Sequence, residues 1–201
     1  MDKKTLLVGV LALVVIAITA AGVWMFGPSG ELRGTAYTEP YPLAPEFDLT
    51  GGNGNDVRLS EMRGNIVLLF FGYTTCPDVC PTTMAELKSV TDKLGAEKSK
   101  NVKVILVTVD PERDTPQRMQ EYVNHFSKDF IGLTGAEAEL AKVWNDYGIF
   151  RQVVDENSAA GYGIDHTARI TLIDQNGNLR ASYGFDTPVD DIVHDVKLLL
   201  D

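Results

Sequence analysis

The sequence predicts an α/β fold in a single globular domain. Two continuous apolar runs of strand length occupy residues 65–73 and 102–110, and between them apolar residues recur on one face of a helical stretch from about Pro81 to Leu94. Such runs are typical of strands buried on both faces of a sheet. A strand, a helix and a second strand in this order form a βαβ unit, so we expect the two strands to be parallel.

The elements around this unit follow from turn and cap signals. Glycine and asparagine in "GGNGN" and "QNGN" favour hairpins, Thr115 and Pro116 can cap and begin a helix, and Gly148 can end one. The predicted order is a β-hairpin ("EFDLT" and "VRLS"), the βαβ unit, helices in "TPQRMQEYVNHF" and "AEAELAKVWNDYG", a hairpin ("RITLID" and "LRASYGF") and a helix in "VDDIVHDVKLLL".

This order predicts a thioredoxin-like fold with an N-terminal β-hairpin and an inserted hairpin or loop before the last strands. A topology of this kind places a site at the carboxyl end of the first long strand, where the chain turns into its helix. The only two cysteines of the chain, in "CPDVCP", lie at that junction.

The N-terminal segment predicts a membrane anchor. Residues 5–30 carry no charged side chain, and at about 1.5 Å per residue their apolar part has the length needed to span bilayer hydrocarbon. Lys3 and Lys4 precede it. The positive-inside tendency then predicts a cytoplasmic N-terminus over residues 1–5, a transmembrane helix over residues 6–26, and the remaining chain on the periplasmic side.

A cleaved signal peptide is the alternative interpretation, because Thr19 and Ala21 resemble a small-residue cleavage site. Both interpretations export the globular part. Proline and glycine without a period over residues 27–44 predict a linker, followed by the folded domain over residues 45–201. With the anchor retained, the protein is a single-pass protein of the inner (cytoplasmic) membrane.

Composition and charge narrow the function classes. With 44% hydrophobic and 23% charged residues, the chain is neither disordered nor a disulfide-dense miniature. The formal net charge is −10 and no block of lysine or arginine occurs, which argues against nucleic acid as a ligand, because neutralising phosphates needs a basic face. An acidic surface suits basic partners or cations, or serves only solubility.

The spacing of Cys76 and Cys80 decides between a structural and a chemical role. A structural disulfide is the default for an exported protein. Closing so small a ring removes little entropy from the unfolded chain, so the bond would add little stability. A redox switch or a metal site therefore explains this pair better than a structural bridge.

Pro81 lacks an amide hydrogen and suits the first helical position, which predicts Cys80 as the N-cap and Cys76 in the loop ahead of it. Both sulfurs then face the positive end of the helix, which favours thiolates. Thiolates select Cu(I), zinc or iron-sulfur chemistry, and an iron-sulfur cluster usually needs more cysteines than this chain has. Two sulfurs need at least one further ligand.

Three histidines are candidates for that ligand. His194 has acidic neighbours on a predicted helix and His125 lies near a helix end, so both have ordinary explanations. His166 follows the glycine-bearing loop "DENSAAGYGID" and directly precedes a strand, so it can reach a neighbouring site, although a surface histidine in a turn fits the same pattern. Met84 is a further sulfur, but it shares a helical face with Leu87, which predicts core packing.

Three motifs together resemble those of a known family. "CPDVCP", "DPERDT" and "DHTARITLID" occur in an order and spacing similar to the Sco family, also called SenC, of copper-binding assembly factors for cytochrome c oxidase. The resemblance extends from about residue 45 to the end, and a single membrane anchor fits it. It implies a thioredoxin-like copper chaperone that binds one copper ion, Cu(I) or Cu(II), through Cys76, Cys80 and His166.

The resemblance also implies partners. Copper would pass to the CuA-bearing subunit of cytochrome c oxidase, or the protein would reduce the cysteines of that centre beforehand. Another copper chaperone or a thiol oxidoreductase is a further expected partner. On this interpretation the protein is a metallochaperone rather than an enzyme. We also expect the loop over residues 155–165 to be mobile without metal and more ordered with it, because it leads directly to His166.

The "DPERDT" motif allows two interpretations. Asp110 ends a parallel strand, and Asp114 and Thr115 can satisfy amides of the following helix, which describes a structural turn. In the second interpretation Asp110, Glu112 and Asp114 present an acidic rim to a partner near the metal. Asp78, between the cysteines, likewise either steers a partner or stabilises the start of the helix.

The main alternative function is a membrane-anchored thiol-disulfide oxidoreductase, in which Cys76 attacks and Cys80 resolves. Redox motifs of this fold have two residues between the cysteines, and here there are three. No proline lies between Pro116 and Pro188, where such enzymes place a cis-proline opposite their cysteines. A non-catalytic interaction module is a third option, but it leaves the cysteines and His166 without a shared role.

Overall fold

The structure, a computed structural model, describes residues 30–158 and 161–200. The residues from Leu32 onward belong to one folded unit. The transmembrane helix predicted over residues 6–26 lies outside the described residues. Among the helices that are described, none is long and apolar enough to cross a membrane.

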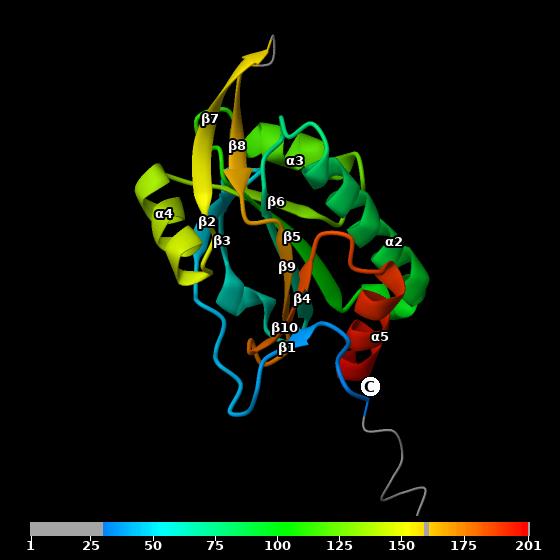
Figure 1. The fold of residues 1–201 in the computed structure, drawn as a ribbon. Coiled ribbons are helices and arrows are strands. Elements are labelled where there is room, and N and C mark those ends of the chain that lie inside the picture. Colours follow the sequence, from blue (N-terminus) through cyan, green and yellow to red (C-terminus); the bar gives the residue numbers. More distant parts are fainter. Residues whose placement is uncertain (1–29, 159–160, 201) are drawn as a thin grey trace, which may run out of the picture. The chain divides into compact units, whose positions relative to one another are not determined.

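The strands of the described residues form one mixed sheet of eight strands and a separate two-stranded hairpin (Figure 1). The strands of the large sheet are Thr35–Ala36 (β1), Asp48–Gly51 (β2), Asp56–Arg58 (β3), Ile66–Gly72 (β4), Val102–Thr108 (β5), Ile131–Thr134 (β6), Arg169–Ile173 (β9) and Leu179–Gly184 (β10). Their order across the sheet is β1-β10-β9-β4-β5-β6-β2-β3. The hairpin pairs Arg151–Ser158 (β7) with Gly161–His166 (β8).

Helices cover both faces of the large sheet. They span Val79–Ser99 (α2), Pro116–Asn124 (α3), Glu137–Asp146 (α4) and Val189–Leu200 (α5), and a short 3₁₀ helix, η1, spans Leu59–Met62. Because α2 and α3 connect adjacent parallel strands in the same direction, right-handed crossovers place both on one face, where α5 packs against α2. On the other face, beside α4, Tyr147 packs on Phe71 with ring centroids 5.4 Å apart.

The parallel pair β4 and β5 forms the centre of the core, as the βαβ prediction requires. All seven residues of β4 are buried, because its side chains alternate between two covered faces. The register pairs Ile66 with Val102 and Gly72 with Thr108, so the carboxyl ends of both strands meet at one edge of the sheet. The cysteine loop and the "DPERDT" segment both leave the sheet at that edge.

Most of the other predicted elements are confirmed. The two expected hairpins form as β2 with β3 and β9 with β10, and Gly177 in the second turn has a φ of 79°. Thr115 caps α3, since its side chain accepts a hydrogen bond from the backbone N–H of Arg118 at 3.3 Å. Gly148, with a φ of 61°, follows α4 as a glycine at a helix end should.

The bounds of α2 differ from the predicted helix over residues 81–94. The helix begins at Val79, so Pro81 is its third residue rather than its first. Proline fits there equally well, because none of the first four amides of a helix has an intrahelical partner. Toward the other end, Gly95 has a non-helical φ of 78° and kinks the helix, which then continues to Ser99.

Two segments without a strand pattern nevertheless pair with the sheet. β6, four residues long, lies parallel to β5 and antiparallel to β2. Within residues 27–44, for which the sequence predicts a linker, Thr35 pairs with Ser182 of β10 and Leu43 bridges Asn178. Backbone N–H and C=O groups at a sheet edge can pair with a chain of any composition, so proline and glycine content did not reveal these contacts.

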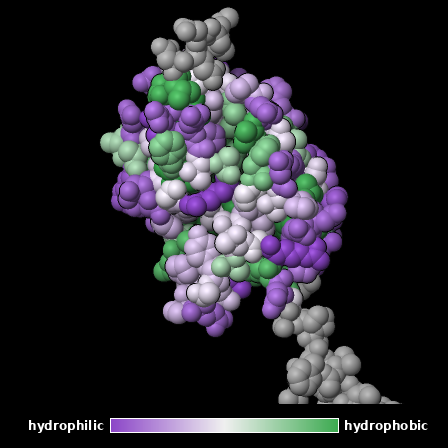
Figure 2. All heavy atoms as spheres, viewed as in Figure 1, coloured by the Kyte–Doolittle hydropathy of each residue, from purple (hydrophilic) through white to green (hydrophobic). Residues whose placement is uncertain are grey.

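The insertion before the last strands, predicted as a hairpin or a loop, is the β7–β8 hairpin, and most of residues 155–165, expected to be a glycine-bearing loop, belong to its strands. The hairpin register pairs Arg151 with His166. Phe150 and Val153 are exposed by 58% and 49%, and Figure 2 shows hydrophobic side chains on the surface over this part of the molecule, among hydrophilic ones. Ile164 of β8 is nevertheless buried in the main hydrophobic core and Tyr162 packs against that core, so the second strand of the hairpin joins the core although Phe150 and Val153 are exposed.

Candidate metal centre

The two cysteines lie on either side of the junction between β4 and α2. Cys76 belongs to the loop, as predicted, and Cys80 lies in the first turn of α2. The prediction that Cys80 is the N-cap is wrong, because Asp78 occupies that position. The backbone N–H of Cys80 donates to the sulfur of Cys76 at 3.3 Å. An amide that has no partner within the helix thus donates to a sulfur. The sequence predicted this stabilisation of a thiolate by the positive end of the helix.

The sulfur of Cys80 is held in a tightly packed place. Cys80 is fully buried, and a methyl group added at Gly72, the last residue of β4, would lie 2.9 Å from its sulfur and 3.1 Å from the ring of Phe70. Only a glycine at the end of β4 leaves room for this sulfur. Neither cysteine is in a disulfide.

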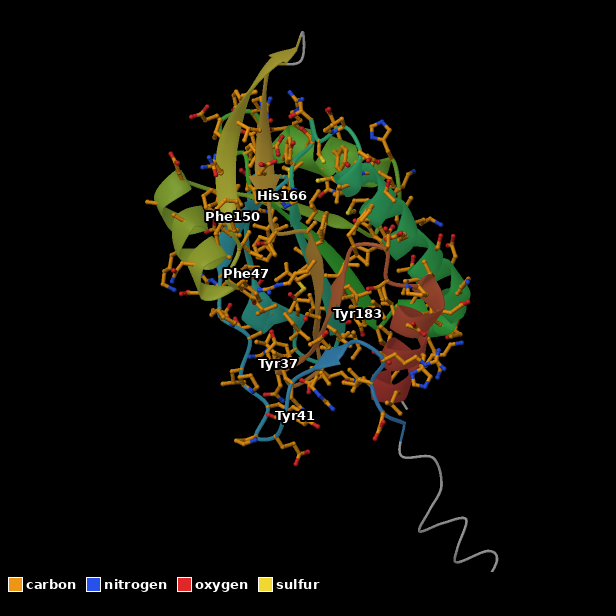
Figure 3. The ribbon with its side chains drawn as sticks, in the orientation of Figure 1. Tyr37, Tyr41, Phe47, Phe150, His166 and Tyr183 are labelled. Atoms are coloured by element: carbon orange, nitrogen blue, oxygen red, sulfur yellow. The ribbon has the colours of Figure 1, made fainter. Side chains whose placement is uncertain are left out.

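His166, the last residue of β8, brings an imidazole to the two sulfurs. Its Nε2 atom lies 3.6 Å from the Cys80 sulfur, and the donor atoms of Cys76, Cys80 and His166 all lie within 4.8 Å of one another. No other group of three or more such side chains occurs in the part of the chain that the structure describes. The structure thus brings together all three residues that the sequence singled out, and Figure 3 shows His166 at the end of the hairpin.

The second ring nitrogen of His166 orients the imidazole. Nδ1 lies 3.2 Å from the carbonyl oxygen of Thr167, and since that oxygen only accepts, Nδ1 carries the proton in this hydrogen bond. Tyr73 and Phe70 meet the ring edge to face, with centroids 5.8 and 6.4 Å away. Nε2 therefore faces the sulfurs, where it donates to a thiolate when the ring is protonated and offers a lone pair to a metal when it is neutral.

The two thiols share one proton unequally. A hydrogen bond from the Cys80 thiol, helped by His166 and by the backbone N–H groups of Asp78 and Cys80, lowers the pKa of Cys76 to about 4 although burial opposes it. The same hydrogen bond to Cys76, together with burial and the negative charge of Cys76, raises the pKa of Cys80. Cys76 is consequently a thiolate at neutral pH, and a cation that binds both sulfurs displaces the remaining proton.

The site opens to solvent through a small cavity. The cavity has a volume of about 230 Å³ and is lined from both sides, by the cysteine loop and by the end of the hairpin, with Tyr73, Cys76, Pro77, Asp78, Val79, Ile164, Asp165, His166 and Ala168. A larger groove of about 710 Å³ lies along the far half of α2 and the start of β5, and no cysteine or histidine lines it. Of the two, only the smaller cavity is lined by side chains that can bind a soft metal ion, Cys76 and His166.

The remaining sulfur and the other histidines lie outside the group. Met84 is fully buried in the hydrophobic core, as predicted. His125 follows α3 as its C-cap residue. His194, which the sequence suggested to be a solvated residue, is two-thirds buried, and its Nδ1 lies 3.0 Å from Asp195, a fully buried carboxylate.

The "DPERDT" motif is a structural turn, but not only through helix amides. Asp110 and Asp114 are both buried, which excludes them from an acidic rim, and Glu112 is exposed. Asp114 accepts hydrogen bonds from Thr74 rather than from the following helix. Burial raises the pKa of Asp114, while its hydrogen bonds oppose that shift.

Sequence reasoning missed three residues that position the site: Tyr73, Arg113 and Tyr162. The hydroxyl of Tyr73 accepts the backbone N–H of Ile164 at 3.2 Å, and Arg113 stacks on the ring of Tyr162. Burial raises the pKa of Tyr73, so it remains a neutral phenol. Each of these contacts joins segments that are far apart in the chain, so no local sequence pattern predicts it.

The fold and this group of side chains define a thioredoxin-like protein with two thiols and an imidazole at the mouth of its first long helix. The SCO1/SenC family model matches residues 35–201. The chain belongs to the SCO1/SenC family, so the resemblance seen in its motifs is confirmed.

Relatives with names of the same family support this assignment. An SCO2-like protein from Rickettsia prowazekii is 32% identical over 192 residues, which is 94% of this chain and 90% of that protein. Among solved structures, ScoI of Bradyrhizobium japonicum with copper bound is 36% identical, with a TM-score of 0.71 over 78% of this chain and 99% of that chain. Apo Sco1 of Thermus thermophilus is 37% identical, with a TM-score of 0.75 over 86% of this chain and 99% of that chain.

Proposed function

We propose that this protein is a membrane-anchored copper chaperone. In this proposal Cys76, Cys80 and His166 bind Cu(I) or Cu(II), and the protein assists assembly of the CuA centre of cytochrome c oxidase. The observation that carries the proposal is the convergence of two sulfurs and one imidazole nitrogen within 4.8 Å from two separate segments. Membership of the SCO1/SenC family and the likeness to a copper-bound ScoI support the choice of metal and of role.

The donor set fits copper as a cargo. Thiolate sulfur suits Cu(I), and imidazole suits Cu(II) as well, so one site of this composition can hold either ion. The cavity beside Cys76 and His166 is open to solvent, which is what a site needs if a partner's ligands are to replace its own. The acidic net charge of −10 suits attraction of a cation or of a basic partner surface.

The proposed location and partners rest on the sequence and the family. The apolar residues 6–26, with Lys3 and Lys4 before them, support a single-pass anchor that places the domain on the periplasmic side of the inner membrane. The proposed recipient is the CuA-bearing subunit of cytochrome c oxidase. Another copper chaperone or a thiol oxidoreductase is the proposed partner on the supply side.

The test compares His166→Ala with a matched control, His125→Ala, on reduced protein. We expect wild type to bind Cu(II) with a sulfur-to-copper charge-transfer band and to bind Cu(I) tightly. His166→Ala should lower Cu(II) affinity by more than the roughly 10–100-fold that loss of an outer-shell partner costs, because it removes a ligand. Cu(I) affinity should fall much less, since two thiolates remain.

The control has a clear expectation as well. His125 lies outside the group, so His125→Ala should leave both affinities and the charge-transfer band unchanged. Equal Cu(II) affinity in wild type and His166→Ala would remove His166 from the site, and absence of copper binding in wild type would overturn the proposal.

A second function, thiol-disulfide exchange, is favoured by one observation: Cys76 has a pKa lowered to about 4 and stands beside a free partner thiol. The Cys76 thiolate would attack a substrate disulfide and release one substrate thiolate. Cys80 would then displace the second substrate sulfur, leaving a Cys76–Cys80 disulfide and two substrate thiols. Steady turnover of a disulfide substrate and a thiol reductant by metal-free protein would favour this function over copper transfer.

A further inference from the structure

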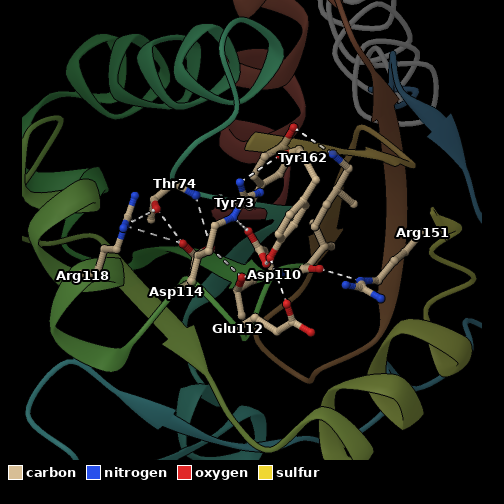
Figure 4. A network of polar contacts seen from close by, with 12 residues as sticks. Tyr73, Thr74, Asp110, Glu112, Asp114, Arg118, Arg151 and Tyr162 are labelled. Atoms are coloured by element: carbon tan, nitrogen blue, oxygen red, sulfur yellow. Dashed lines mark hydrogen bonds and ion pairs between the residues drawn. The ribbon is translucent and has the colours of Figure 1, made fainter. Parts of the chain in front are cut away.

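The hairpin that carries His166 and the strand that leads to the cysteines belong to different sheets. β7 and β8 pair only with each other, whereas β4 is central in the large sheet. Thr167 and Ala168 join His166 to β9, which pairs with β4, so the large sheet fixes one end of the hairpin. The remaining freedom of the hairpin, and with it the distance between the imidazole and the sulfurs, depends on side-chain contacts between the hairpin and the rest of the domain. Residues 110–115, the "DPERDT" motif, make such contacts toward both sides (Figure 4).

Arg113 connects the motif to the hairpin. Its guanidinium carbon lies 3.7 Å from the centroid of the Tyr162 ring, and its Nη1 donates to the carbonyl oxygen of Tyr162 at 2.9 Å. Its Nε pairs with the carboxylate of Asp110, and the Tyr162 hydroxyl donates to the same carboxylate at 2.8 Å. Asp110 is fully buried, so its charge requires these partners. The three side chains form a closed set of contacts between the motif and β8.

Asp114 connects the same motif to the cysteine loop. Its carboxylate accepts the hydroxyl of Thr74 at 2.5 Å and the backbone N–H of Thr74 at 3.2 Å. It also accepts the hydroxyl of Thr108, the last residue of β5, at 2.7 Å. Thr74 lies two residues before Cys76, so these hydrogen bonds hold the loop that presents the sulfur.

A tight turn joins the two connections. The carbonyl oxygen of Asp110 accepts the backbone N–H groups of Arg113 at 3.2 Å and Asp114 at 2.9 Å. The backbone N–H of Asp110 donates to the hydroxyl of Thr108 at 2.8 Å. The side chains that reach the hairpin and the cysteine loop thus start from one hydrogen-bonded turn, so their separation is set by its backbone.

We propose that residues 110–115 are a brace that sets the distance between the cysteine pair and His166, with Arg113 as the positioning residue for the imidazole. Arginine is needed because one planar cation stacks on Tyr162 and donates in two directions, which a lysine ammonium cannot do. The brace is present without metal, and only the copper measurements below rest on the proposed function.

The experiment compares Arg113→Gln with Arg180→Gln, a closely matched control. Arg180 also stacks on a tyrosine, 4.0 Å from the Tyr41 ring, and pairs with an aspartate, Asp174, at 3.2 Å. Both arginine side chains are 19% exposed. Asp174 follows the last residue of β9, at the opposite end of that strand from His166, so Arg180→Gln removes the same kind of contacts away from the site.

The first measurement is amide hydrogen exchange of metal-free protein. In Arg113→Gln we expect the amides of residues 162–166 to exchange at least about tenfold faster than in wild type, because the hairpin loses its hold on the turn. Arg180→Gln should leave those residues at the wild-type rate. Unchanged exchange of residues 162–166 in a folded Arg113→Gln protein would overturn the brace.

The second measurement is Cu(II) binding in a double-mutant cycle with His166→Ala. Arg113→Gln alone should lower Cu(II) affinity by about 10–100-fold, as loss of an outer-shell partner does, with a weaker imidazole nitrogen signal in the electron paramagnetic resonance spectrum and a retained charge-transfer band. In the His166→Ala background, Arg113→Gln should cause no further loss. Losses that add across the cycle would contradict a role through His166.

Two further outcomes separate the brace from the proposed function. If wild type binds no copper, the proposed function fails, and the exchange measurement decides the brace by itself. If Arg113→Gln does not fold, Tyr162→Phe replaces it, because this variant keeps the stacked ring and loses only the hydroxyl that binds Asp110. The same change in exchange, smaller in size, supports the brace, and wild-type exchange of residues 162–166 in Tyr162→Phe overturns it.

Discussion

The two halves of the candidate metal centre differ in how they are held. The sulfur half lies on β4 and α2, where every residue of β4 is buried and Cys80 is fully covered. The imidazole half lies on a hairpin that pairs with no strand of the main sheet and leaves Phe150 and Val153 exposed. Core packing sets the position of the sulfurs, whereas the position of the ring depends on polar contacts of the hairpin together with the packing of Ile164 and the aromatic contacts of Tyr73 and Phe70.

Because of this difference, one site contains donor atoms that are fixed in place and a donor atom that can move. A donor fixed by the core can move only if the core repacks, which is costly in a close-packed interior. A donor held by hydrogen bonds and a stacked arginine can shift with local opening of its hairpin. If the protein takes up and releases copper as proposed, its site combines a sulfur pair at a fixed position with a third donor whose contacts can change.

The largest effect should come from crowding the sulfur half. In Gly72→Ala the new methyl group would meet the Cys80 sulfur at 2.9 Å, so either the sulfur or the end of β4 must move. We expect a loss of about 1–3 kcal/mol in the free energy of unfolding, measured by denaturant titration, because overpacking a core has this cost. Both Cu(I) and Cu(II) affinities should fall together, unlike the selective effect of His166→Ala.

Gly184→Ala is the control for this substitution. Gly184 also ends a strand of the large sheet, and a methyl group there meets nothing within 4 Å. It should leave stability and copper affinity unchanged. If Gly72→Ala behaves in the same way, Cys80 is not held by the packing described above.

An intermediate effect should appear in the reactivity of the two thiols with pH. Because the pKa of Cys76 is lowered to about 4, its thiolate fraction is already complete near pH 6 and should not rise further toward pH 8. In reduced, metal-free protein, Cys76 should react with iodoacetamide at pH 6 about two- to fivefold faster than a cysteine with an ordinary pKa of about 8.5, because its roughly 300-fold larger thiolate fraction is mostly offset by the lower intrinsic nucleophilicity of a low-pKa thiolate. Peptide mass spectrometry resolves the two sites, and Cys80, whose pKa is raised, should remain unmodified.

This measurement also tests the link between the halves. His166 contributes to the lowered pKa of Cys76, so in His166→Ala the onset of Cys76 alkylation should move to higher pH. The profile in His125→Ala should match wild type. An alkylation rate of wild-type Cys76 that rises about tenfold per pH unit from 6 to 8 would contradict the thiolate assigned here.

The smallest effect should be the response of the hairpin to copper. Amides of residues 161–166 should exchange several-fold faster than those of β4 without metal, and copper should slow them by linking His166 to the sulfurs. Hydrogen exchange with and without Cu(I) or Cu(II) measures this. The amides of β4 provide the internal reference, because the core should not respond. Hairpin exchange unchanged by either ion would place His166 outside the metal-bound state.

Sequence patterns located the sulfur half well and the imidazole half only in part. The apolar runs, the caps at Thr115 and Gly148 and the junction that carries the cysteines are local signals, and the structure confirms them. His166 was selected chiefly by resemblance to a family, because a histidine before a strand has many ordinary explanations. β6 has only four residues and no periodicity, so its place was visible only in the sheet.

The contacts that complete the site were beyond any local pattern. Arg113 meets Tyr162 across 49 positions of the chain, and Thr74 meets Asp114 across 40. Both aspartates are of a residue type that usually lies on the surface, so an acidic rim was one of two interpretations of Asp110 and Asp114, although both are buried. Burial depends on what the remaining chain places over a residue, and spacing does not report it.

By itself, the sequence determined that the core is a parallel βαβ unit with a cysteine pair at its carboxyl edge, because apolar periodicity and caps act over a few residues. Only the tertiary structure decided that an imidazole reaches the sulfurs and that a turn with two buried carboxylates contacts both the hairpin and the cysteine loop. The hairpin and the large sheet meet through side chains that are far apart in the sequence. Local backbone propensity does not act on such contacts, so it could not predict how close the imidazole and the sulfurs lie.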